Sequence, residues 1–204
     1  MLNDEFARRI HRFWFGEMGE NGLCAPKLTS KWFAGDEGFD RLVEREFGAT
    51  LRVAGAGEPE GMSQTPRGAL AYILLTDQFP RNIHRGVPES FAFDGLSLAV
   101  CRRGMEKGFD RSLFPIERIF FYMPLMHSES FAIQKISVET FSSLAGEFRE
   151  APEVYERLKS SEDFARRHFE IIERFGRYPH RNGILGREST EEEIEFLKQP
   201  GSSF

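Results

Sequence analysis

Residues 65–82, Thr-Pro-Arg-Gly-Ala-Leu-Ala-Tyr-Ile-Leu-Leu-Thr-Asp-Gln-Phe-Pro-Arg-Asn, hold the signals that decide the fold. Thr65 can cap a helix, and Pro66 suits a first helical turn, where a proline costs no hydrogen bond. The apolar residues that follow at helical spacing are Leu70, Ile73 and Leu74. They predict a helix with one buried face. Because proline blocks helix continuation, we expect this helix to stop at Phe79-Pro80.

The same combination of cap, apolar stripe and glycine or proline stop recurs along the chain. It predicts further helices over about residues 3–15, 36–55 and 88–107, and a short helix after Pro115 that ends before Met123-Pro124. A helix capped by Ser128 follows, and then one from Pro152 to Phe175 with room for a break near Ser160-Ser161. The last predicted helix begins at a capping box of Ser189 with Glu192. No segment alternates apolar and polar residues with a period of two. The sequence therefore predicts an all-α fold.

Size and composition indicate one globular domain that covers residues 1–204. A chain of 204 residues can bury a sizeable core, and its 21 Phe predict an aromatic-rich one. The net charge of −5 argues against nucleic acid as a partner. No signal peptide and no apolar run long enough for a membrane span are present, so we expect a cytoplasmic protein without membrane contact.

Motifs that would name a reaction are missing from the sequence. It has no phosphate-binding glycine loop, no nucleophile elbow and no paired-histidine zinc motif. Cys24 and Cys101 are far apart, and the five His residues lack metal-ligand spacing. We therefore expect no cofactor and no metal, and the catalytic residues, if there are any, stay unknown.

Three predicted helices carry a polar residue where the periodicity predicts burial: Asp77, Gln134 and His168. An unpaired buried carboxylate costs several kcal/mol, so Asp77 needs a cationic or strongly donating partner. The candidate donors are Arg81, Arg174, Arg177, Arg181 and Arg187. Arginine is plentiful, since 21 of the 27 basic residues are Arg, and its planar fork suits carboxylates and phosphates.

Two interpretations of these residues stay open. In the first they form a purely structural network, in which Asp77, Glu173 and Glu188 each neutralise an arginine and tie helix ends together. The spacings Glu170–Arg174 and Glu173–Arg177 favour such pairs. The related sequences Phe79-Pro80-Arg81-Asn82 and Tyr178-Pro179-His180-Arg181-Asn182 then represent a helix stop used twice.

In the second interpretation, the turns at residues 80–85, 124–129 and 179–188 line a cleft. Arginine and asparagine side chains there could hold a small phosphate or carboxylate, and a histidine could move a proton. The candidate residues of both interpretations together are Asp77, Gln78, Arg81, Asn82, His127, Glu129, Gln134, His168, Glu173, Arg177, His180, Arg181, Asn182, Arg187 and Glu188.

Several long motifs make the chain resemble a known family. They are Phe13-Trp14-Phe15-Gly16, Lys31-Trp32-Phe33, Asp77-Gln78-Phe79-Pro80-Arg81-Asn82, Tyr122-Met123-Pro124-Leu125, His127-Ser128-Glu129, Glu173-Arg174-Phe175-Gly176-Arg177-Tyr178-Pro179-His180-Arg181-Asn182 and Leu185-Gly186-Arg187-Glu188-Ser189-Thr190. In this order they resemble the bacterial domain-of-unknown-function family number 924 over nearly the whole chain. The resemblance implies a tetratricopeptide-like array of antiparallel helix pairs, and it implies no activity, cofactor or functional residue.

Two functions follow as hypotheses. One is an interaction module that holds a peptide or protein partner in a groove, which the implied tetratricopeptide-like fold favours by analogy. The alternative is an enzyme or small-molecule binder with an Arg/His/Asn pocket for a small anionic ligand. The first predicts a long, open channel lined by side chains at helical spacing, and the second an enclosed pocket where Arg181 and His127 meet.

Overall fold

The computed structural model describes residues 2–55, 57–58 and 61–203. In these ranges the chain forms helices and no strand, apart from one isolated bridge between Met18 and Cys24. The α-helices are α1 (Leu2–Phe15), α2 (Pro26–Thr29), α3 (Glu37–Gly55), α4 (Pro66–Ile73), α5 (Phe79–Ile83), α6 (Asp94–Glu106), α7 (Pro115–His127), α8 (Phe131–Glu147), α9 (Pro152–Phe175) and α10 (Glu191–Leu197). The all-α prediction is confirmed.

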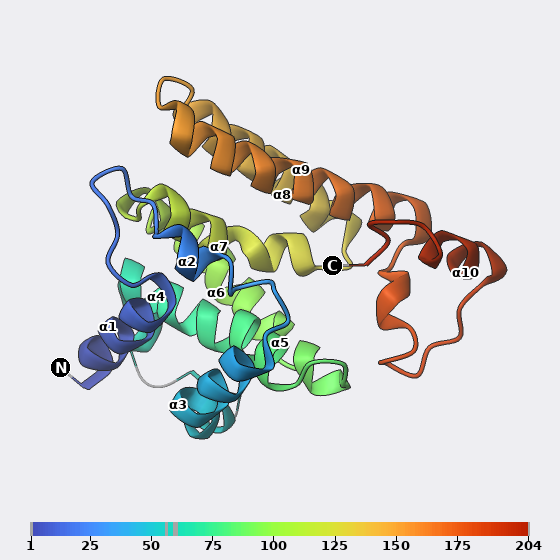
Figure 1. The fold of residues 1–204 in the computed structure, drawn as a ribbon, viewed down its shortest axis with the longest axis horizontal. Helices are drawn as coiled ribbons and strands as arrows, with labels where there is room; N and C mark the ends of the chain where they lie inside the picture. Colours follow the sequence, from blue (N-terminus) through green and yellow to red (C-terminus); the bar gives the residue numbers. More distant parts are fainter. Residues whose placement is uncertain (1, 56, 59–60, 204) are drawn as a thin grey trace.

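The helices enclose one main core. The long helices α8 and α9 form an antiparallel hairpin, α7 lies between this hairpin and the helices α1 and α3 to α6, and α10 lies near the C-terminal end of α9 (Figure 1). Helix α7 is central, since its residues from Pro115 to Met126 are all buried. Aromatic side chains dominate the core, as in the contact of Trp14 with Trp32 and Phe120. A small second cluster of Ile171, Ile172 and Tyr178 packs beside residues 178–188, the segment that we call the C-terminal corner.

Several helix ends lie where the sequence predicts them. The Thr65 side chain accepts a hydrogen bond from the Gly68 amide at 3.1 Å, and Pro66 begins α4. Asp36 accepts one from the Phe39 amide at 2.7 Å just before α3. Gly176 ends α9 with a φ of +67°, a conformation that glycine adopts without strain. Local capping chemistry therefore fixes these ends.

The expected stop at Phe79-Pro80 is wrong. After α4 the chain makes a π-helical turn, Leu74–Gln78, and continues directly into α5, with Pro80 in its first turn. The Phe79 amide donates to the Leu74 carbonyl, five residues back. A π turn accommodates one extra residue, so the helix can pass the proline by widening instead of ending.

Other boundaries also differ from the prediction. Helix α7 continues through Pro124 to His127, because burial of almost the whole helix outweighs one missing hydrogen bond. Ser128 therefore follows α7 and does not cap α8, which begins after Ser130. Helix α9 has no break, and residues 88–107 form a 3₁₀ turn, Pro88–Phe91, followed by α6.

The last helix is capped one residue later than expected. Thr190 is the cap, its hydroxyl accepts from the Glu193 amide at 3.2 Å, and Glu193 accepts from the Thr190 amide at 2.8 Å. The sequence offers both registers because Ser and Thr are adjacent and three Glu follow them. Arg177, whose guanidinium meets the buried Glu193 at 2.6 Å, favours the later one.

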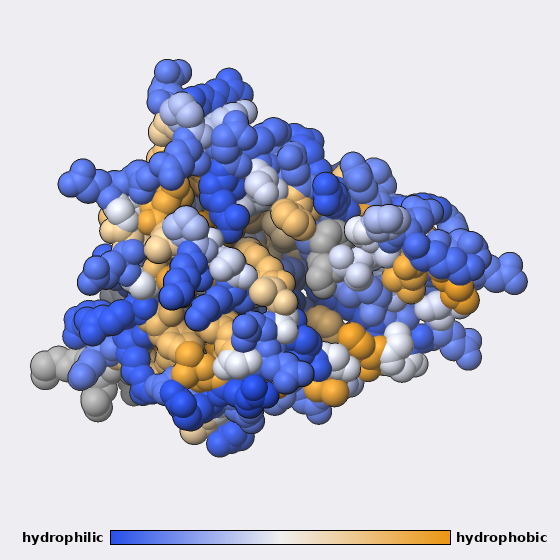
Figure 2. Space-filling model, viewed as in Figure 1, coloured by the Kyte–Doolittle hydropathy of each residue, from blue (hydrophilic) through white to orange (hydrophobic). Residues whose placement is uncertain are grey.

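A regular tetratricopeptide-like array is not shown by this arrangement. The helices α8 and α9 form a long antiparallel pair, while π and 3₁₀ turns interrupt the chain between α3 and α7 (Figure 1). Hydrophilic residues cover most of the face seen in Figure 2, with hydrophobic residues in separate groups. Within the described ranges, no helix combines the length and apolar character that a membrane span requires.

Candidate functional site

Two of the three predicted turns, residues 80–85 and 124–129, meet at Asp77. This residue lies in the π turn between α4 and α5 and is fully buried. Its carboxylate lies 2.7 Å from His127 Nδ1, accepts from Gln78 Nε2 at 2.7 Å, and lies 3.4 Å from Arg81 Nη1. His127 is the last residue of α7, so this carboxylate joins two helix ends that are 50 residues apart in sequence.

Arg81 extends the contacts to α6. Its two Nη atoms donate to the two carboxylate oxygens of Asp94 at 2.8 and 3.0 Å, and Nη1 also donates to the Asp77 carbonyl at 2.7 Å. Asp94 in turn lies 3.5 Å from Arg181 Nη1, on the C-terminal corner. His127, Asp77, Arg81, Asp94 and Arg181 thus form a continuous chain of contacts, which we call the Asp77 network.

Arg181 is held differently from Arg81. Its guanidinium lies 4.5 Å from the ring centroids of both Phe91 and Tyr178, so two aromatic rings fix it by cation–π contact. The residue is only 7% exposed, and the 3.5 Å contact with Asp94 is its polar interaction within the described part of the chain. Arg181 Nε is buried without a hydrogen-bond partner there. Among the donors of Arg181, Nε therefore has no protein acceptor in this part of the chain and Nη1 has a distant one.

Both ends of the Asp77 network face the same depression in the surface. This depression, the Arg181 pocket, has a volume of about 400 Å³ and is partly open to solvent. Its lining residues are Pro88, Phe91, Ala92, Asp94, Gly95, Leu98, Pro124, His127, Ser128, Glu129, Arg181 and Leu185. A mostly apolar wall with a few polar groups is typical of small-molecule sites.

Burial and charge determine the protonation of the Asp77 network. Burial raises the pKa of the Asp77 carboxyl, but Arg81 and His127 outweigh it and hold that pKa below its ordinary value. Burial, and then Arg81, lower the pKa of His127. Burial and Arg81 also lower the pKa of Arg181, which Asp94 only partly offsets. At neutral pH the carboxylate is ionised and the imidazole is neutral.

A second group of buried polar residues supports the pocket from behind. Gln134 Nε2 lies 2.6 Å from the Ser128 carbonyl and 2.8 Å from the Tyr178 hydroxyl, which itself donates to the Met126 carbonyl at 2.5 Å. His168 Nδ1 lies 2.8 Å from the Phe164 carbonyl. Gln134 and His168 are both buried, as their places on apolar stripes predict, and Gln134 fixes the end of α7 against Tyr178.

Glu129 lines the pocket and pairs with Arg187. Their side chains form a bidentate pair with distances of 2.7 and 3.0 Å, and Glu129 also accepts from the Tyr178 amide at 2.9 Å. His180 lies beside them, with its ring 5.5 Å from that of Tyr178. Burial, and then Arg181, lower the pKa of His180 to about 4.

The structure separates the remaining candidates from the Arg181 pocket. Glu173 and Glu188 are exposed, and their carboxylates belong to no salt bridge among the described residues, so the predicted pairing of Glu173 with Arg177 is wrong. Arg177 and Asn182 instead contact Glu193 at 2.6 and 3.2 Å. Glu193 is better placed because it is buried at the start of α10, whereas Glu173 points to solvent.

Asn82 and Arg174 also belong elsewhere. Asn82 donates to Asp40 on α3 at 2.7 Å, and Asp40 also pairs with Arg85. Arg174 pairs with Glu192 at 2.8 Å on the surface, not with Glu170. The two related proline-containing sequences therefore share the role of their arginines, since Arg81 and Arg181 both reach Asp94. Their asparagines differ, since Asn82 contacts Asp40 and Asn182 contacts Glu193.

Asp94 and Phe91 are the site residues that sequence reasoning missed. Asp94 links the two arginines, and Phe91 stacks on Arg181 and lies 5.6 Å from Arg81. An acidic residue at the start of a predicted helix is usual, so Asp94 gave no distinctive signal. The sequence Phe91-Ala92-Phe93-Asp94, which closely follows Pro88, is the feature that could have indicated these two residues.

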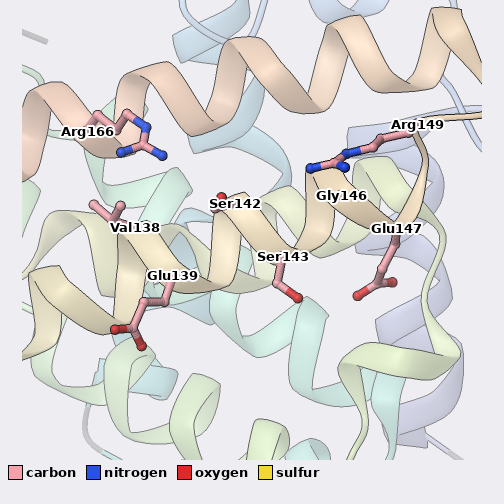
Figure 3. Close-up of a pocket in the computed structure, with 8 residues that line it drawn as sticks. All are labelled: Val138, Glu139, Ser142, Ser143, Gly146, Glu147, Arg149 and Arg166. Atoms are coloured by element: carbon pink, nitrogen blue, oxygen red, sulfur yellow. The ribbon is translucent and has the colours of Figure 1, made fainter.

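A second, broader depression lies along α8. It has a volume of about 740 Å³, and its α8 residues recur at helical spacing: Val138, Glu139, Ser142, Ser143, Gly146 and Glu147. Arg149 and Arg166 complete it, and Arg166 extends from the neighbouring helix α9 (Figure 3). Two of its charged side chains are engaged within the chain, since Glu147 pairs with Arg118 and Arg166 with Glu162. Among the described residues, no cluster of His, Cys, Asp and Glu could hold a metal.

Comparison with known proteins supports the motifs. No curated protein matches the chain. A solved structure described as a protein of unknown function, ATU0120 from Agrobacterium tumefaciens, is 32% identical, with a TM-score of 0.79 over 96% of this chain and 98% of that one. The family model described as bacterial protein of unknown function (DUF924) matches residues 10–201. This chain therefore belongs to the DUF924 family of bacterial proteins.

Proposed function

We propose that this protein binds a small molecule bearing a carboxylate or phosphate group in the Arg181 pocket. The observation that carries the proposal is the state of Arg181: a guanidinium fixed between two rings at the pocket wall, whose polar contact among the described residues is the long one of 3.5 Å with Asp94. A desolvated cation gains free energy from any anion that supplies the missing acceptors.

The other charges around the pocket are better compensated. Asp94 has a bidentate partner in Arg81, and Glu129 has one in Arg187. Asp77 has three partners. Among the charged side chains of the pocket lining, Arg181 thus has the weakest compensation, which favours an anionic ligand. The volume of about 400 Å³ favours a molecule of metabolite size over a protein segment.

Thermal denaturation with inorganic phosphate or succinate as probe tests the proposal. We expect both probes to raise the midpoint of the wild-type protein. Arg181→Met keeps an apolar stem between the rings but removes the charge, and we expect it to weaken probe binding by about 10-fold or more, the value of a lost charge-assisted hydrogen bond. Arg174→Met, on the surface and outside the pocket, is the matched control.

A second variant keeps the test valid if Arg181→Met fails to fold. Gly95 lines the pocket on α6, and a Cβ there would meet no atom within 4 Å. Gly95→Leu should therefore fill the pocket without disturbing the Asp77 network. Stabilisation by phosphate or succinate that survives in Gly95→Leu would refute the proposal. If the wild type binds neither probe and Arg181→Met does not fold, the results would favour the purely structural network.

An interaction module is the second candidate function, and the depression along α8 favours it, because its lining follows helical spacing as a peptide groove would. This depression supports a ligand less well than the Arg181 pocket does, because two of its charged side chains, Glu147 and Arg166, already have partners within the chain. A peptide library displayed against the protein should yield peptides whose binding Ser142→Arg abolishes and Gly95→Leu leaves intact.

A cytoplasmic location also stays a prediction.

A further inference from the structure

The Asp77–His127 pair fixes the tautomer of the imidazole. An ionised carboxylate only accepts hydrogen bonds, so the 2.7 Å contact between Asp77 Oδ1 and His127 Nδ1 requires the proton on Nδ1. In the neutral ring, Nε2 then carries the free electron pair. Gln78 and Arg81 hold the carboxylate from its other sides, so the ring cannot turn without breaking a buried contact.

His127 presents this Nε2 to the Arg181 pocket. Its side chain lines the pocket and keeps 14% of its surface exposed. Within the described part of the chain, Nε2 forms no hydrogen bond, and it is not among the buried polar atoms that lack a partner. Solvent can therefore reach it. The site combines an anion-binding group and an oriented, solvent-accessible base at two ends of one network.

The surroundings keep the imidazole neutral near pH 7. The charged or titratable groups that interact with His127 are Asp77 and Arg81 on the α4–α5 helix, Asp94 on α6, His168 on α9, and His180. Glu129 and Arg181 line the same pocket. Burial and then Arg81 lower the pKa of His127, and the two aspartates offset this only in part. A neutral imidazole with a free Nε2 is the form that accepts a proton.

We propose that the Arg181 pocket is catalytic, with His127 acting through Nε2 as a general base in the hydrolysis of a small ester that carries a carboxylate or phosphate group. This inference rests on the proposed anion-binding function, since Arg181 would hold the anionic end. Asp77 is a positioning residue, because it acts through the imidazole and does not reach the pocket wall.

The reaction balances without an oxidant or a further reactant. Water attacks the acyl carbon while one of its protons moves to His127 Nε2. The bond from the acyl carbon to the alcohol oxygen then breaks, and the leaving oxygen takes the proton back from Nε2. The products are an acid and an alcohol, and the imidazole returns to its neutral form.

Two activated esters test the inference: 4-nitrophenyl hydrogen succinate, which carries a carboxylate, and the uncharged 4-nitrophenyl acetate. We expect the wild type to hydrolyse the succinate ester with a kcat/KM about 10-fold or more above that for the acetate, because only the former can use Arg181. His127→Gln should lower kcat by about 100-fold or more, the usual contribution of a general base, with KM and succinate binding unchanged.

The pH profile tests the role of Asp77. We expect the wild-type kcat/KM to rise with pH up to the pKa of His127, which lies below its ordinary value, and then to stay level. Asp77→Asn removes the carboxylate that favours the imidazolium, so it should lower kcat and move the rise to lower pH. A merely structural role would change stability and leave the profile in place. His84→Gln, outside the pocket, should change neither parameter.

The outcomes separate the two proposals. Suppose that succinate binding depends on Arg181. If the wild type then hydrolyses neither ester above the buffer rate, or if His127→Gln retains full hydrolysis, the catalytic role is overturned and the binding function stands. Absence of phosphate and succinate binding to the wild type would overturn both. If His127→Gln does not fold, modification of the wild type with diethyl pyrocarbonate replaces it: the inference requires loss of hydrolysis in step with His127 modification, and succinate protection against both.

Discussion

Acid should destabilise this protein through His168, and the size of the effect follows from its surroundings. His168 is 5% exposed, and burial, followed by the nearby His127, lowers its pKa to about 3. An unfolded histidine titrates near pH 6.5, so below that pH the unfolded chain binds a proton that the folded chain refuses. At about pH 4.5 the difference of two pH units corresponds to roughly 2.7 kcal/mol lost from the free energy of unfolding. This loss of stability is absent above about pH 6.5 and grows as the pH falls toward 3.

Urea denaturation at about pH 7 and pH 4.5 measures this loss. His168→Asn keeps a donor that can reach the Phe164 carbonyl, now 2.8 Å from His168 Nδ1, but cannot be protonated. We expect its loss of stability between the two pH values to be smaller than the wild-type loss by roughly 2–3 kcal/mol. His84→Asn, at a partly exposed helix end, serves as the matched control. Equal losses in the wild type and His168→Asn would refute the reasoning.

Two further predictions concern packing and the C-terminal corner. A Cβ at Gly104 would lie 2.5 Å from Phe121, so Gly104→Ala should lower the free energy of unfolding by roughly 1–3 kcal/mol. Gly146→Ala on α8, where a Cβ would meet nothing within 4 Å, should raise it by about 0.5–1 kcal/mol, and urea denaturation compares the two variants. Glu193→Gln weakens the contacts with Arg177 and the α10 cap, and we expect a loss of roughly 1–3 kcal/mol by the same measurement, while Glu192→Gln on the surface should have a small effect.

The helices could be predicted where local chemistry decides. Thr65 with Pro66, Asp36 before α3, and Gly176 after α9 each act within a few residues, and the structure confirms them. The continuation of the helices past Pro80 and Pro124 could not be predicted, because both prolines lie in helices whose burial depends on distant segments. A proline stops an isolated helix, but tertiary packing can outweigh that local preference.

The site was predictable to the extent that it breaks a pattern. Asp77, Gln134 and His168 interrupt apolar stripes, and all three are buried in the structure. Asp94 breaks no pattern, because an acidic residue in the first turn of a helix is usual, yet it joins Arg81 to Arg181. A sequence can indicate that a buried carboxylate needs a partner, but which arginine supplies it depends on how the corners pack.

The π turn explains how neighbouring residues come to serve different parts of the molecule. One extra residue in a turn rotates everything after it by about 100° relative to an uninterrupted α-helix. Beyond the turn, Arg81 reaches Asp94 on α6, while the adjacent Asn82 reaches Asp40 on α3. Arg81 also donates to the carbonyl of Asp77, inside the turn itself. The backbone irregularity and the charge network therefore hold each other in place, so a substitution that relaxed the π turn would also move Asp77 away from His127.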